Sequence, residues 1–271
     1  MRRALSTAWY LRHRSGIAAV VAPLQTNHAD VLIRVNHDWV VALYPHLDLE
    51  KSSRGAFGND EDWTRAQQLV ASIHVVAPSS LDVTPPAEDF TIPFRAEFFA
   101  LLASNDQSWR GGPFAESART LLERHAEPIR SGFARFDTLV GLAQERQEHW
   151  GITHGEPQAG NIVWRAERRD MVVVDWDTCA IAPRERDLWQ LTPPHHAALT
   201  GLRPYLAATG LPETAVSADR LALYRLRWDL AEIAIYADQF SQEHVDSEDA
   251  RVAWGGLLSS IGLLPNHLRQ P

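Results

Sequence analysis

Three side chains suited to handling protons and a metal ion lie close together in the sequence. Glu156 and Asn161 belong to a loop at residues 154–161, and Asp175 follows the apolar run at 172–174. Asp175 offers an anionic oxygen to magnesium, Asn161 a neutral amide oxygen, and Glu156 a carboxylate that can accept a hydroxyl proton. Because a transferred phosphoryl group needs mainly positioning and charge neutralisation, this set predicts phosphoryl transfer.

A β-hairpin is expected to position these groups. Apolar runs at Ile162–Trp164 and Met171–Val174 flank a charged turn at Arg165–Asp170, which is the pattern of two strands joined by a turn. The hairpin would hold the loop at one end and Asp175 at the other. The simpler interpretation treats Asn, Asp and Gly as ordinary turn residues beside a hairpin, but it does not explain the order of the residue types.

The first part of the chain predicts a small lobe. The pattern predicts a helix over residues 2–14. Apolar, β-branched runs at 18–22, 31–35 and 39–43 predict the strands of a small sheet. A polar, Gly- and Ser-rich stretch at 48–60 then separates this lobe from the rest.

The remainder is predicted to be mostly helical. Apolar residues recur at helical spacing from Trp63 to Ile73, and Leu226 to Phe240 marks the apolar face of a long helix. Further helices are expected over 90–103, over 114–150 with breaks near Gly111, Gly112 and Pro128, and over 248–264.

Composition limits the partners. The chain has 271 residues, of which 45% are hydrophobic, and a net charge of −8, so we expect a globular protein that does not bind nucleic acid. No long apolar run suggests a signal peptide or a membrane-spanning helix. The single cysteine, Cys179, cannot form an intramolecular disulfide and is expected to be buried, consistent with a reducing, cytoplasmic location.

The motif as a whole resembles a known family. His154-Gly155-Glu156 through Asn161, followed by Val173-Val174-Asp175-Trp176-Asp177, is similar to the catalytic signature of the aminoglycoside phosphotransferase family, to which choline and homoserine kinases are related. The segment at 182–189 resembles the family's downstream segment, in which an aspartate, here Asp187, braces the catalytic loop.

The resemblance implies a fold and a domain division. The fold is an α+β, protein-kinase-like one, with a truncated small β lobe at residues 1–46 and a mostly helical large lobe at 47–271. The large lobe would carry the catalytic loop at 154–161 and the metal-binding strand end at 175–177. The site is expected between the two lobes.

The resemblance also implies roles and cofactors. ATP and Mg2+ are the expected cofactors. Glu156 would act as the base or hydroxyl-orienting group, and Asn161 and Asp175 would be catalytic residues that hold the metal. The segment at 40–45 resembles the hinge strand whose backbone holds adenine. The remaining residues fall into a nucleotide-binding group and a supporting group: Leu43, Tyr44 and His46 in the first, and His154, Asp177 and Asp187 in the second.

The chain departs from the family in three places. Glu156 stands where the wider family usually has Asp, and Gln158 where many members have a second His. Before the first long helix the family also has a glycine-rich hairpin and a strand lysine that contact the phosphates. Here Gly16 stands alone and Lys51 follows the hinge strand. We therefore expect either a chain truncated at its front or a pseudokinase with weakened nucleotide binding. Arg34 is a candidate substitute cation, although a solvent-facing side chain is the simpler expectation.

Three other sequence features allow alternative interpretations. Asp175-Trp176-Asp177-Thr178 also fits the D-x-D-x-T nucleophile motif of haloacid-dehalogenase-like phosphatases, but no lysine follows it. His195 and His196 lack the spacing of a transition-metal site. Several of the ten Trp residues fall in apolar contexts and are expected to be in the core: Trp63, Trp164, Trp189 and Trp228.

A polar stripe predicts where the acceptor binds. Asp229, Glu232 and Tyr236 follow one another at helical spacing off the apolar face. More acids follow in the sequence, so the stripe predicts a cationic acceptor, and the alternative is a solvated acidic face. The sequence as a whole predicts an ATP-dependent phosphotransferase acting on a hydroxyl of a small acceptor, such as an aminoglycoside or amino alcohol. The alternative is a nucleotide- or ligand-binding pseudokinase, or an N-terminally truncated fragment with impaired activity.

Overall fold

The chain forms two compact units. The computed structural model describes residues 1–49, 57–103, 109, 111–145, 147, 150–166, 170–193 and 199–269. Unit 1 comprises Met1–Glu88 and Arg146–Leu221, and unit 2 comprises Asp89–Glu145 and Ala222–Pro271. The predicted lobe boundary at residue 46 stays a prediction. The residues outside the described ranges include Lys51, Gly55, His195 and His196.

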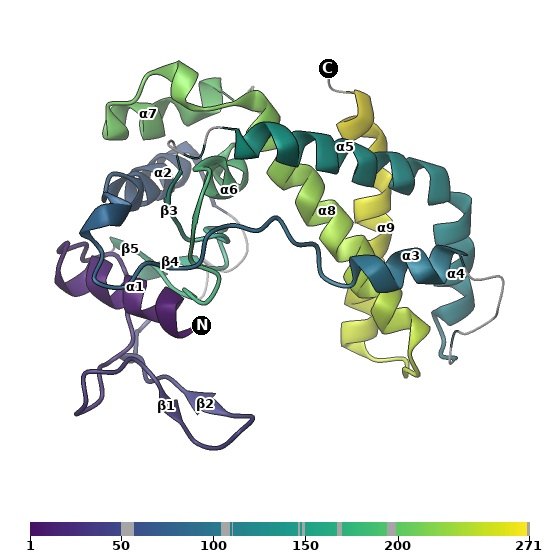
Figure 1. Cartoon of the computed structure of the whole chain (residues 1–271), viewed down its shortest axis with the longest axis horizontal. Helices are drawn as coiled ribbons and strands as arrows, with labels where there is room; N and C mark the ends of the chain where they lie inside the picture. Colours follow the sequence, from purple (N-terminus) through teal and green to yellow (C-terminus); the bar gives the residue numbers. More distant parts are fainter. Residues whose placement is uncertain are drawn as a thin grey trace. The chain divides into compact units, whose positions relative to one another are not determined.

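Unit 1 contains the predicted N-terminal and second helices, α1 (Arg2–His13) and α2 (Asp60–His74), together with α6 (Glu185–Leu188) and α7 (Arg203–Thr209) (Figure 1). Asn59 caps α2, because its side chain accepts the N–H of Asp62. Unit 1 also has short 3-10 turns, among them η2 (Pro78–Ser80), η4 (Trp189–Leu191), η5 (Thr200–Leu202) and η6 (Glu213–Ala215).

Three two-stranded antiparallel sheets lie in unit 1. They pair β1 (Ile33–Arg34) with β2 (Val40–Val41), β3 (Gly151–Thr153) with β6 (Ala180–Ala182), and β4 (Ile162–Arg165) with β5 (Asp170–Val173). The β4–β5 pair confirms the predicted hairpin, with Ile162 opposite Val173. The strand predicted over 18–22 is reduced to one parallel bridge between Val20 and Val173.

The core of unit 1 lies between these helices and strands. Leu11 of α1, Ile73 of α2 and Ile152 of β3 are fully buried, and Trp176 packs in the same cluster. Cys179 is buried there as a free thiol, as predicted. This core fixes the positions of the strands that carry the motif. The tryptophans expected in the core are partly buried: Trp63, Trp164, Trp189 and Trp228.

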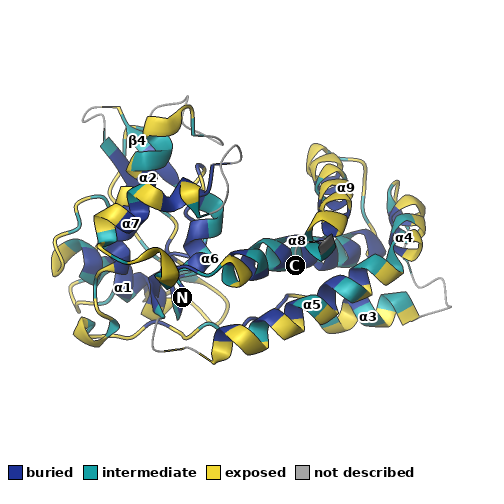
Figure 2. Ribbon diagram, turned by 90° about the horizontal axis from the view of Figure 1, so that it is seen from above, coloured by how far each residue is buried: buried dark blue, intermediate teal, exposed yellow. Residues whose placement is uncertain are grey.

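Unit 2 is helical in its described residues. It contains α3 (Arg95–Ala103), α4 (Ala115–Arg124), α5 (Ala126–Gln144) and α9 (Glu248–Arg269), and it takes most of α8 (Ala218–Ser241), which begins in unit 1. Figure 2 shows α5 with buried residues along one side and exposed residues along the other.

One prediction about these helices was wrong. The helix expected over 90–103 begins only at Arg95, because Phe90 and Phe94 have left-handed backbone angles, φ 57° and 55°. The break expected near Pro128 is present, because α4 ends at Arg124 and α5 begins at Ala126, which puts Pro128 in the first turn of α5, where a proline is tolerated. No helix among the described residues is long and apolar enough to cross a bilayer.

Candidate active site

The hairpin brings the loop and the strand end together. The Val174 N–H donates to the carbonyl of Asn161 at 2.9 Å, immediately beyond the paired residues Ile162 and Val173. The N–H of Asn161 in turn donates to the carbonyl of Gln158 at 2.8 Å. Asn161 and Asp175 therefore emerge at the same end of the hairpin, as the sequence pattern predicts.

The side chain of Asn161 closes the loop on itself. Its Nδ2 donates to the carbonyl oxygen of Glu156 at 2.9 Å. Because the amide nitrogen is committed to the loop, the amide oxygen is the atom of this side chain that can serve a cation. The bond also ties Glu156 to Asn161, so the two predicted catalytic residues are positioned by one contact.

Asp175 sits at a sharp change of backbone direction. Its φ is 64°, a left-handed conformation that Asp tolerates better than most residues. Burial raises the pKa of its carboxyl, and the neighbouring charge of Asp177 raises that pKa further. Two carboxylates that repel one another beside a neutral amide oxygen form a donor set suited to a hard divalent cation.

The residues present therefore fit magnesium. In the described part of the chain, no group of three His, Cys, Asp or Glu side chains forms a complete metal cage. Magnesium commonly takes one or two protein carboxylates and completes its shell with water and phosphate oxygens. Asp175 and Asn161 at the end of the hairpin, with Asp177 two residues further along the chain, would offer ligands of that kind.

His154 braces the loop from inside. Its Nε2 donates to the carbonyl of Val174 at 2.8 Å, and its Nδ1 accepts the N–H of Glu156 at 3.2 Å. Burial lowers the pKa of this histidine, so the ring is neutral at neutral pH. The ring links the loop to the end of β5, which supports the predicted supporting role.

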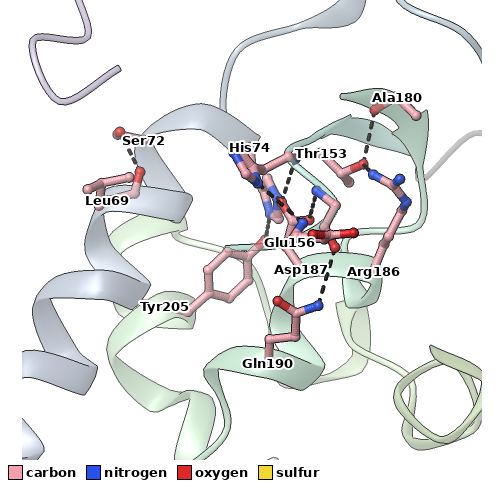
Figure 3. Close-up of polar contacts among 12 residues, drawn as sticks. Leu69, Ser72, His74, Thr153, Glu156, Ala180, Arg186, Asp187, Gln190 and Tyr205 are labelled. Atoms are coloured by element: carbon pink, nitrogen blue, oxygen red, sulfur yellow. Dashed lines mark hydrogen bonds and ion pairs between the residues drawn. The ribbon is translucent and has the colours of Figure 1, made fainter. Parts of the chain in front are cut away.

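Asp187 holds the loop backbone with both carboxylate oxygens. Oδ2 accepts the N–H of His154 at 2.8 Å, and Oδ1 accepts the N–H of Gly155 at 2.7 Å (Figure 3). Burial would raise the pKa of Asp187, but a hydrogen bond from His74 and the charges around it outweigh burial and lower that pKa. This geometry is the bracing contact that the sequence resemblance implies.

Arg186 is a residue that sequence reasoning missed. Its guanidinium donates to Thr153 Oγ1 at 3.1 Å and to the carbonyl of Thr178 at 2.9 Å, and its Nε lies 2.9 Å from Glu88 Oε2. It also packs directly on Gly155, which has a φ of 105°. Arg186 thus joins the loop to the turn after Asp177. Nothing in the spacing of the segment at 182–189 singles it out.

The predicted nucleotide residues lie in unit 1. The carbonyl of Leu43 accepts the N–H of Leu24 at 2.7 Å, and the Leu43 side chain is exposed. Burial raises the pKa of Tyr44, and the charges of Asp175 and Asp177 raise it further, so Tyr44 lies within electrostatic reach of these two carboxylates. His46 is exposed. Their binding of adenine stays a prediction.

The predicted acceptor stripe lies on α8, in unit 2. Asp229 is 5% exposed, and its Oδ2 lies 2.6 Å from Nε2 of His267 on α9. Burial raises the pKa of Tyr236 to about 12, and a hydrogen bond with Glu232 contributes to the shift. Asp229 is therefore a buried, paired group, and Glu232 and Tyr236 contact one another.

The chain was compared with known proteins. Residues 10–216 match the model of the phosphotransferase enzyme family, named APH. Protein StrN of Streptomyces griseus is 26% identical over 249 residues, which cover 90% of this chain and 72% of StrN. The match confirms the family resemblance and leaves the phosphatase alternative without support.

Solved structures show the same fold. Spectinomycin phosphotransferase APH(9)-Ia, in complex with ADP and spectinomycin, superposes with a TM-score of 0.73 at 16% identity, covering 97% of this chain and 82% of that one. The aminoglycoside phosphotransferase of Alicyclobacillus acidocaldarius gives 0.60 at 14% identity, covering 99% and 82%. The choline kinase LicA of Streptococcus pneumoniae gives 0.51 at 12%, covering 96% and 80%. The predicted protein-kinase-like α+β fold is confirmed.

Proposed function

Because the chain belongs to the phosphotransferase enzyme family, we propose that it transfers the terminal phosphoryl group of ATP to a hydroxyl group of a small, cationic acceptor. Membership of this family supports small-molecule phosphotransferase activity. That ATP is the donor and that the acceptor is cationic are our own proposals. One similar structure holds ADP together with spectinomycin, and another holds AMP. Both support a nucleotide as the phosphate donor.

One observation carries the proposal. The Asn161 side chain donates to the carbonyl of Glu156 while its backbone carbonyl receives the N–H of Val174. These two bonds hold the backbones of Glu156 and Asn161, and of the residue before Asp175, at one end of the hairpin, which supports a site built from these three side chains. Phosphoryl transfer needs this combination of proton acceptor and cation ligands held on a rigid element.

In the mechanism, each residue has a separate task. Glu156 accepts a hydrogen bond from the acceptor hydroxyl and takes its proton as the oxygen attacks. Asn161 and Asp175 would hold magnesium, which would neutralise charge on the phosphates as ADP leaves. Asp187 and Arg186 keep the loop backbone fixed, and this fixed position limits the motion of Glu156.

A pseudokinase is the competing function. It is suggested by the absence of a lysine before the hinge strand, because the only lysine, Lys51, follows that strand. Arg34 offers little compensation, because its side chain is exposed and donates to the carbonyl of His37 at 3.0 Å. We place the reaction in the cytoplasm, which the free thiol of Cys179 supports.

The test is transfer of radiolabelled phosphate from ATP to a panel of hydroxylated amines, beside neutral analogues of the same size. The proposal predicts a labelled product with at least one amine and weaker labelling of its neutral analogue. Nucleotide binding without transfer to any compound would favour the pseudokinase.

A further inference from the structure

A line of buried hydrogen bonds runs from α7 through α2 to the catalytic loop. Tyr205 Oη lies 3.0 Å from Nδ1 of His74, and Nε2 of His74 lies 3.0 Å from Oδ2 of Asp187. That same oxygen receives the N–H of His154. None of the side chains of Tyr205, His74 and Asp187 is exposed to solvent, and Figure 3 shows them converging on the loop.

The chemistry of the bonded groups shows which atom donates in each hydrogen bond. The charged and titratable groups around Asp187 are His74, His154 and Arg186, and Tyr205 lies beyond His74. An ionised carboxylate only accepts, so Nε2 of His74 carries the hydrogen that Asp187 receives. When the ring is neutral, its Nδ1 accepts the hydroxyl hydrogen of Tyr205, and the line then runs in one direction, from Tyr205 to Asp187.

The Asp187 carboxylate depends on these donors because it is a buried charge that solvent does not reach. A buried carboxylate is stable only when hydrogen bonds satisfy both oxygens. Oδ1 receives one backbone N–H, from Gly155, whereas Oδ2 receives the N–H of His154 and the ring N–H of His74. Removing the His74 donor would leave the Asp187 carboxylate free to turn away from the loop.

We propose that His74 is a positioning residue that, with Tyr205, fixes Asp187 and thereby holds the His154–Gly155 backbone and Glu156 in place. The bond joins residues 113 positions apart, from α2 to α6, and α2 packs against α7. The position of the loop is thus set by these helices as well as by its own hairpin. The proposal rests on the proposed function only in taking this loop as catalytic.

The first test measures hydrogen exchange at the amides of His154 and Gly155 by NMR. In His74→Leu we expect exchange at both amides to speed up about tenfold or more, because a hydrogen bond to a charged group is lost. His74→Gln, whose amide can donate to Asp187, should restore most of the protection. Tyr205→Phe should give a smaller effect of the same sign.

A matched control separates positioning from general loss of stability. Gln67 on α2 donates to the carbonyls of Leu191 and Gly201, and its oxygen accepts the N–H of Tyr205. Gln67→Leu breaks buried bonds between α2 and its neighbours without touching Asp187. Exchange at the two amides that rises equally in Gln67→Leu and His74→Leu would overturn the proposal.

Kinetics provide the second readout. His74→Leu should lower kcat about tenfold or more with little change in the KM for nucleotide, and His74→Gln should recover most of kcat. A rise in KM with kcat unchanged would contradict a positioning role. If the wild-type chain shows no turnover, the proposed function fails, and the exchange experiment still decides the role of His74.

Discussion

A single methyl group added at Gly155 should strongly destabilise the protein. Its backbone has a φ of 105°, which L-residues rarely adopt, and its N–H is bound to Asp187. A Cβ built there would lie 2.7 Å from Cζ of Arg186. Gly155→Ala therefore strains the backbone and displaces a guanidinium that joins Thr153 to Thr178.

The size of the effect follows from two contributions. A left-handed backbone costs an L-residue about 1–2 kcal/mol. Moving Arg186 away loses at least one hydrogen bond to a charged group, about 1.5–3 kcal/mol. Together they predict that Gly155→Ala lowers the free energy of unfolding by about 2.5–5 kcal/mol.

The assay is urea unfolding followed by circular dichroism, with Gly160→Ala as control. Gly160 belongs to the same loop, has no positive φ and has no atom within 4 Å of a Cβ built there, so its variant should stay within about 1 kcal/mol of wild type. Combining Gly155→Ala with Arg186→Met should recover the steric part, giving a coupling energy of about 1 kcal/mol or more. Equal destabilisation in Gly155→Ala and Gly160→Ala would refute the reasoning.

Three further predictions concern charge and exposure. The lowered pKa of Asp187 stabilises the folded protein, and this stabilisation is complete above the ordinary aspartate pKa of 3.8 and is lost as the pH falls below it. Acid titration of Asp187→Asn should therefore show a flatter loss of stability than wild type. An unchanged slope would contradict this. Burial raises the pKa of the Cys179 thiol to about 12, so a thiol reagent at pH 8 should label it slowly in native protein and rapidly in urea, whereas fast native labelling would show an accessible thiol. On α8, Glu232→Gln should raise the KM of a cationic acceptor without loss of stability. An unchanged KM in Glu232→Gln would remove the acceptor stripe. Asp229→Asn should instead lower the thermal midpoint, because it weakens a buried pair with His267; an unchanged midpoint would contradict a stabilising pair.

The β4–β5 hairpin could be predicted because its signals are local. Alternating apolar runs, a charged turn and the order of Glu156, Asn161 and Asp175 all lie within one stretch of chain. The long helices were predictable for the same reason, since periodicity persists over several turns. The β3–β6 pair was not, because strands of three residues carry no readable period.

The supporting contacts could not be predicted because they join distant positions. His74 meets Asp187 across 113 positions, and Arg186 meets Glu88 only once β6 and the segment before α6 are folded. Sequence patterns report which face of an element is apolar, but they do not report which elements meet. The stripe on α8 illustrates the same limit, because helical spacing placed Asp229 off the apolar face whereas pairing with His267 buries it.

Magnesium-dependent phosphoryl transfer is the measurement that tests the central claim most directly. Nucleotide binding and turnover should be measured with and without magnesium for the wild-type chain, for Asp175→Ala and for Asp170→Ala. Asp170 begins the same strand, β5, and pairs with Arg165 at the far end of the hairpin. We predict turnover that requires magnesium, that is lost in Asp175→Ala and that persists in Asp170→Ala. Turnover that survives in Asp175→Ala, or that does not need magnesium, would contradict the account.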